Sequence, residues 1–150
     1  MRIETKRLIA FVLTLSGLLA TNSACAQTKE QASDIDKLVG DWSGESVCVN
    51  KEKFPSCNDE KVVYHITKVA DKPNTVNLSA DKIVDGKPEF MGAFDFVYDP
   101  KKQTLTCEYK TDRVDIAMEF TLKDDVLDGS MTSLPDKTQI RRMTVKKDKK

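Results

Sequence analysis

The side chains that could perform chemistry in this 150-residue chain are a single histidine, four cysteines and many carboxylates. A metal site needs several histidine or cysteine ligands at short spacing, and His65 has neither a second imidazole nor a nearby Cys-x-x-Cys motif. The alternation in Tyr64-His65-Ile66 is typical of a strand on which the imidazole faces solvent. We therefore expect a surface histidine, with no metal site and no general base.

The acidic residues and glycines form no recognisable catalytic motif. Acidic pairs occur at Asp34/Asp36 and at Asp124-Asp125, in an N-terminal stretch and a turn, where their expected role is solvation. Glycoside hydrolysis needs a carboxyl group with a raised pKa in a cleft, and no such pair can be identified. A glycine-rich phosphate loop and a Gly-x-Ser-x-Gly elbow are also missing from the sequence. We predict that the protein is not an enzyme and uses no cofactor.

The cysteines indicate one disulfide and one free thiol. Cys48 and Cys57 flank a short polar segment, and a bridge between them would close a loop of about ten residues. Cys107 lies on a later strand, far from the first one around a barrel, so we expect it to be a thiol in an apolar wall. Such a position raises the pKa of a thiol and argues against a nucleophile. The alternative is three inert thiols.

The first 26 residues resemble a secretory signal peptide. Arg2, Lys6 and Arg7 precede an apolar run over residues 8–20, which is too short to span a bilayer. Cleavage after Ala26 would release a soluble chain in the periplasm or outside the cell. The alternative is a lipoprotein in which Cys25 is the lipidated first residue, and only this form would attach to a membrane. We favour the soluble product.

The charge of the remaining 124 residues argues against a nucleic-acid partner. Removal of residues 1–26 takes away three basic groups and one acidic group, so that the balanced charge of the full chain becomes about −2. Nucleic-acid and anionic-membrane surfaces select a basic stripe, which this chain does not carry. The length fits one domain, residues 27–150, and we expect a monomer.

Hydrophobic alternation with short turns predicts an all-β fold. Ile35, Leu38 and Val39 stand at helical spacing and predict one helical turn before the first strand. Turns this short leave no room for crossover helices, so the strands are antiparallel. We expect strands over residues 41–49, 60–69, 75–83, 89–98, 104–110, 113–122, 126–133 and 137–146.

The strongest alternation identifies the residues that should face the interior. An eight-stranded barrel has room for its own side chains or for one small ligand. The expected inward residues on the fourth and sixth strands are Phe90, Gly92, Phe94, Phe96, Tyr98, Val114, Ile116, Met118, Phe120 and Leu122, and their neighbours are Leu105, Cys107, Tyr109, Leu127 and Met131.

The only tryptophan, Trp42, follows Gly40 at the start of the first strand. In a closed barrel the last strand pairs with the first, so a late arginine can cover the indole ring. We expect this arginine to be Arg141, because it shares the inward parity of Met143 and Val145.

Leu38-Val39-Gly40-Asp41-Trp42 resembles the Gly-x-Trp motif that opens the lipocalin-like proteins of the calycin superfamily, and the late arginine resembles their closing partner. The chain is therefore similar to a small exported bacterial lipocalin-like protein with an up-and-down eight-stranded β-barrel. The resemblance implies a carrier or sensor of a small hydrophobic molecule. Residues that could line its pocket are Phe90, Phe94, Phe96, Tyr109 and Met118.

A second hypothesis remains open, in which these aromatic rings fill the barrel and no ligand binds. The protein would then be an envelope interaction module, such as an inhibitor of a cell-wall hydrolase or a folding accessory. Its candidate surface is the loop over residues 51–59.

Overall fold

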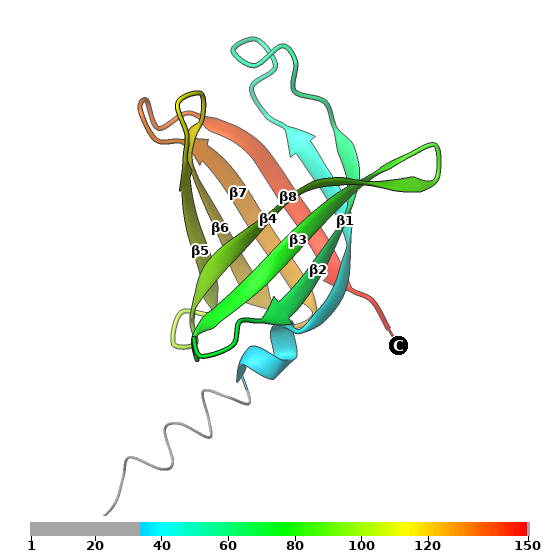
Figure 1. The fold of residues 1–150 in the computed structure, drawn as a ribbon. Coiled ribbons are helices and arrows are strands. Elements are labelled where there is room, and N and C mark those ends of the chain that lie inside the picture. The colour runs from blue at the N-terminus through cyan, green and yellow to red at the C-terminus, as the bar shows by residue number, and fades with distance from the viewer. Residues whose placement is uncertain (1–33, 150) are drawn as a thin grey trace, which may run out of the picture.

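The computed structural model describes residues 34–149, which form a short helix and eight antiparallel strands (Figure 1). Each strand pairs with the next along the chain, and β1 pairs with β8 to close the barrel. The predicted barrel is confirmed, and every predicted strand end lies within two residues of the observed one. The strands are β1 (Gly40–Cys48), β2 (Glu60–Lys68), β3 (Thr75–Val84), β4 (Lys87–Asp99), β5 (Thr104–Lys110), β6 (Asp115–Lys123), β7 (Val126–Ser133) and β8 (Gln139–Lys147).

One end of the barrel is closed by an end plug made of Ile35, Leu38 and Trp42. Residues 34–38 are helical, and the helical spacing turns Ile35 and Leu38 toward the barrel, where both are buried. Trp42 is 0% exposed. Its indole N–H donates a hydrogen bond to the carbonyl of Leu38 at 2.8 Å, which satisfies the one polar atom of a buried ring. The helical turn and the end plug were both expected from the sequence.

The cation that covers Trp42 is Lys147 rather than Arg141, so that prediction was wrong. In the antiparallel pair β1–β8, Trp42 is opposite Lys147 and Cys48 is opposite Arg141. The start of one antiparallel strand meets the end of its neighbour, which puts Arg141 at the far end of the barrel. Its inward parity was predicted correctly, because it lines the interior there.

Two glycines allow β1 to approach its neighbours. Gly40 joins the helix to β1 at φ 130°, a conformation that L side chains rarely adopt. A Cβ at Gly44 would lie 2.1 Å from the carbonyl oxygen of Thr144, so a side chain at this position would separate β1 from β8. Both glycines therefore contribute to closure of the barrel.

A β-bulge on β4 reverses the expected orientation of Phe90. Ala80 pairs with Gly92, whereas the next residue, Asp81, pairs with Phe90, so Met91 is the extra residue on β4. Phe90 is 69% exposed. The prediction that Phe90 faces the interior was wrong, because one unpaired residue shifts all earlier side chains to the other face.

Strands β4 and β5 separate toward the end of the barrel opposite the end plug. They pair only from Val97 to Asp99 and from Thr104 to Thr106, whereas β3 and β4 pair along almost their whole length. The barrel is therefore tightly packed near the end plug and more open at the other end, the mouth.

Val114 was also expected to face inward. This prediction was wrong, because β6 begins one residue later, at Asp115, and Val114 is exposed.

Candidate functional site

A cavity of about 230 Å³ lies inside the barrel between the packed core and the mouth. Its walls are mostly methionine and aromatic side chains, which are apolar and, in the case of methionine, adaptable in shape. Seven of the eight strands that the structure describes contribute side chains to these walls. The lining residues are Ser46, Glu60, Tyr64, Leu78, Ala80, Met91, Phe94, Phe96, Met118, Phe120, Met131, Arg141 and Met143.

The floor of the cavity is held by a set of packed aromatic rings. Phe120 makes edge-to-face contacts with Tyr64 and with Phe96, at centroid distances of 5.8 and 5.7 Å. All three rings are buried. Because buried rings packed in this way have little freedom to move, they separate the cavity from the end plug and fix its depth.

Three of the five predicted pocket residues line the cavity, namely Phe94, Phe96 and Met118. Phe90 is outside the cavity because the bulge on β4 turns it to the outer face, and Met91 lies in the wall instead. Tyr109 is also outside the lining: it is 40% exposed and packs edge-on against Phe94 at 5.1 Å. The pairing of β4 with β5 ends before it reaches Tyr109, so this ring lies beside the opening between the two strands.

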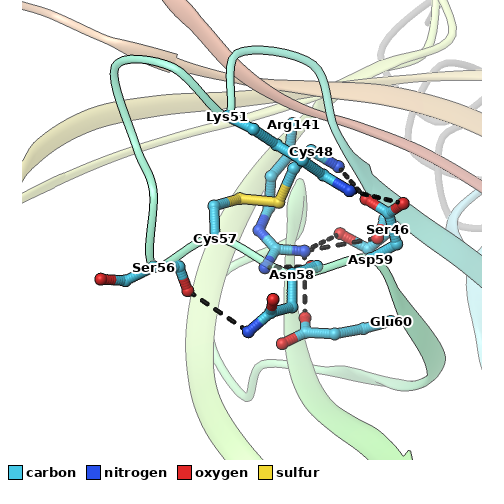
Figure 2. Close-up of a disulfide and its surroundings, with 9 residues drawn as sticks. All are labelled: Ser46, Cys48, Lys51, Ser56, Cys57, Asn58, Asp59, Glu60 and Arg141. Atoms are coloured by element: carbon cyan, nitrogen blue, oxygen red, sulfur yellow. Dashed lines mark hydrogen bonds and ion pairs between the residues drawn. A yellow bond between two sulfur atoms is a disulfide. The ribbon is translucent and has the colours of Figure 1, made fainter.

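The polar end of the cavity is formed by Arg141, Glu60 and Ser46. One guanidinium nitrogen of Arg141, Nη1, lies 3.0 Å from Glu60 Oε2 and donates to Ser46 Oγ at 2.8 Å. The other, Nη2, donates to the carbonyl of Asn58 at 2.9 Å. Figure 2 shows the guanidinium between Glu60 and the disulfide-bonded segment. The side chains of Arg141 and Glu60 are 15% and 22% exposed, so the ion pair is partly shielded from water.

Tyr64 adds a fourth polar group to this end. Burial, as the largest cause, raises the pKa of its phenol to about 12, which leaves the hydroxyl neutral, and a hydrogen bond with Ser46 acts in the opposite direction. Ser46 and Glu60 were not predicted as site residues, and Arg141 was predicted only as the cation over Trp42, although a signal for the cavity was present in all three. Each is a polar residue two positions before a buried apolar residue of the same strand, so that alternation places its side chain on the inward face.

The disulfide-bonded loop over residues 49–59 lies at the mouth. Cys48 and Cys57 are bonded, with a Cα–Cα distance of 6.0 Å, which confirms the predicted pair. The amide of Cys48 donates to Asp59, and this hydrogen bond, together with a second from Lys51, holds the pKa of the Asp59 carboxyl below its usual range. Lys53 pairs with Asp136 in the turn between β7 and β8. The loop is thus fixed at both ends and near its middle.

A second, wider depression of about 650 Å³ lies outside the cavity, between Phe54 of the loop and the turn that joins β5 to β6. Met131 lines both spaces, so they are neighbours. This outer depression has charged side chains on one wall, Lys110 and Arg113 among them.

His65 lies on the outer surface, away from the cavity, between two carboxylates. Its Nδ1 is 2.7 Å from Asp41 and its Nε2 is 3.3 Å from Asp81, so three adjacent strands meet there. The hydrogen bond to Asp41 is the largest cause that raises the pKa of the imidazole. Both ring nitrogens are engaged, and no group of three potential metal ligands is found in the part of the chain that the structure describes.

Cys107 is an unpaired, half-buried thiol that packs against the core. Burial is the largest cause that raises its pKa, and the charges of Asp95 and Glu108 act in the same direction. A thiol with a raised pKa carries little thiolate at neutral pH. Its environment therefore matches the expectation of a thiol that is not activated.

The expected signal peptide, residues 1–26, and the alternative lipidation site, Cys25, lie outside the described residues. Over residues 34–149, no helix is long and apolar enough to cross a membrane. The Cys48–Cys57 disulfide is typical of an oxidising compartment. No protein-family model matches the chain, and no curated protein matches it.

Proposed function

We propose that this chain is an exported, lipocalin-like binding protein, without enzymatic activity, that holds a small and mostly apolar molecule inside its barrel. The observation that carries the proposal is the 230 Å³ cavity with apolar walls and a few convergent polar groups, Arg141, Glu60 and Ser46, at one end. This combination is typical of ligand sites. The end plug closes one end of the barrel, and the cavity lies toward the other end, the mouth.

The volume limits the size of the ligand. Pockets for drug-sized molecules usually measure about 300–1,000 Å³, and this one is smaller. At ~30 Å³ for a water-sized group, it holds roughly eight such groups. A short alkyl chain or a single ring fits, whereas a long lipid would extend into the outer depression.

Native mass spectrometry of the protein purified from its own envelope tests the proposal. We expect a bound molecule that is lost in Ala80→Leu, because Ala80 lines the cavity and a larger side chain would fill it. Ala93→Leu is the matched control, since Ala93 lies on the outer face of β4 and is exposed. A bare mass, together with no uptake of short alkyl compounds, would argue against a carrier. The same spectrum gives the mass of the N-terminus and so tests for a lipid on Cys25.

One observation favours the interaction module as a second candidate. The hairpin of β3 and β4 extends beyond the rest of the barrel (Figure 1) and exposes Val84, Phe90 and Met91. Apolar side chains on a projecting arm are typical of protein contact sites. Inhibition of a cell-wall hydrolase that is lost in Phe90→Ser, with no ligand bound by the wild type, would support this function over the carrier.

A further inference from the structure

The polar end of the cavity also indicates the chemical class of the ligand, an inference that rests on the proposed function. Among the described residues that line the cavity, only Glu60 and Arg141 are charged, and their side chains lie 3.0 Å apart. The negative charge of Glu60 therefore neutralises the cation at the polar end. A ligand that enters the cavity meets an ion pair with no net charge.

The charges around this pair are also balanced. Arg141 lies close enough to Asp59 to lower the pKa of that carboxyl slightly, but Asp59 already binds Lys51 at 3.0 Å. These two cations and two carboxylates leave no excess positive charge at the polar end. An anionic group placed beside Arg141 would approach Glu60 as well, and like charges in a partly desolvated site repel each other.

The ion pair can still form hydrogen bonds with a ligand, both as a donor and as an acceptor. A guanidinium has five N–H donors, and the contacts to Ser46, Glu60 and Asn58 do not use all of them. The carboxylate of Glu60 accepts at more positions than the one that faces Arg141. Only a group that both donates and accepts can use these two sets at once. A hydroxyl does so, whereas a carboxylate has no proton to give to Glu60.

We infer that the ligand has an uncharged polar end of the hydroxyl or primary amide type, which donates to Glu60 and accepts from Arg141, and a short apolar body in the cavity. Tyr64 is consistent with this assignment, because its phenol is neutral and adds no charge at the same end. Glu60 is then the residue that determines specificity against anionic amphiphiles of the same length.

The test uses three probes of equal chain length: 1-octanol, which donates and accepts; 2-octanone, which only accepts; and octanoate, an anion. Affinities are measured at pH 7 from ¹⁵N–¹H spectra of the mature protein, with shifts at Phe94 and Met118 as evidence of binding in the cavity. We expect 1-octanol to bind several-fold more tightly than 2-octanone and at least tenfold more tightly than octanoate.

An apolar pocket of any kind prefers an alcohol to a carboxylate, so the decisive comparison uses Glu60→Gln. This variant keeps the size of the side chain and removes its charge, which leaves Arg141 without its ion-pair partner. We expect the affinity for octanoate relative to 1-octanol to rise at least tenfold. Glu45→Gln is the matched control, because Glu45 is exposed on β1, and it should leave the ratio unchanged.

The outcomes separate the inference from the proposed function. Octanoate bound most tightly by the wild type, or a ratio unchanged in a folded Glu60→Gln variant, would overturn the inference and leave a carrier. Equal affinities for 1-octanol and 2-octanone would also overturn it, because Glu60 would then accept nothing from the ligand. If no probe bound and the native protein carried no adduct, the carrier function would fail and the inference with it.

Discussion

Lys147 lies over the ring of Trp42, with its Nζ 5.5 Å from the ring centroid, and the same amine donates to the carbonyl of Lys37. The side chain thus connects the last strand, the first strand and the helical turn at the closed end of the barrel. Arg141, six positions earlier on the same strand, belongs to the cavity. One strand therefore supplies two cations with separate roles: one closes the barrel and the other forms the polar end of the candidate site.

Trp42→Ala is expected to destabilise the protein by about 3–5 kcal/mol, because it removes the largest side chain of the end plug and leaves a void that its neighbours cannot fill. Trp42 is fully buried and holds the helical turn through its indole N–H. Urea unfolding monitored by far-UV circular dichroism measures the change. A loss below about 1 kcal/mol would mean that the ring does not close the barrel.

Lys147→Met should cost about 1 kcal/mol, the usual size of a partly exposed cation–π contact, and should shift the emission of the single tryptophan. The control is Lys146→Met, since the neighbouring lysine is exposed and does not contact the ring. Arg141→Met should leave the emission of Trp42 unchanged, because Arg141 lies opposite Cys48. An emission change in Arg141→Met alone would reverse the assignment of the two cations.

Phe90→Ser and Phe96→Ala form a pair that tests the bulge on β4. Phe90 is exposed, so its replacement should alter the free energy of unfolding by no more than about 0.5 kcal/mol. Phe96 is fully buried against Phe120, and its truncation should cost about 3–5 kcal/mol. Chemical denaturation of both variants measures these values. Similar large losses in the two would show that the strand is regular and that Phe90 faces the core.

The barrel itself could be predicted from the sequence, because strand alternation and turn residues are local signals. The same local pattern failed at Phe90, where the bulge depends on how β4 pairs with β3 and not on its own alternation. It also failed for Arg141, since parity gives the face of a strand but the register between β1 and β8 decides which residue meets Trp42.

The candidate site could be predicted only in part, because a cavity results from how all the side chains pack. Phe94, Phe96 and Met118 follow from alternation alone. The ion pair of Glu60 with Arg141 joins two strands that are not neighbours in the barrel, so no pattern within one strand indicates it.

Replacement of both Cys48 and Cys57 by serine should destabilise the protein by about 2–3 kcal/mol, because the disulfide restricts a loop of about ten residues in the unfolded chain. Urea unfolding measures the loss. Thiol titration of the unfolded, unreduced mature protein should find one free thiol, that of Cys107. Three free thiols would contradict the disulfide. Cys107→Ser is the control and should leave the loop at the mouth intact.

The stability of the barrel should fall as the pH rises from 6 to 8, because of His65. Its folded-state pKa is raised above 6.5, chiefly by the hydrogen bond to Asp41. The protonated imidazole therefore stabilises the folded protein. This stabilisation is fully present at pH values below the unfolded-state pKa and is lost as the pH rises through the folded-state pKa. The side chain is 40% exposed, so the effect should be about 1 kcal/mol or less.

Urea unfolding at several pH values, together with NMR titration of the single imidazole, measures this dependence on His65. Asp41→Asn should lower the pKa of His65 more than Asp81→Asn does, because Asp41 makes the shorter contact and is the larger cause. His65→Gln is the control and should remove the dependence between pH 6 and 8. A pKa that is the same in wild type and Asp41→Asn would mean that the carboxylates do not hold the imidazolium form.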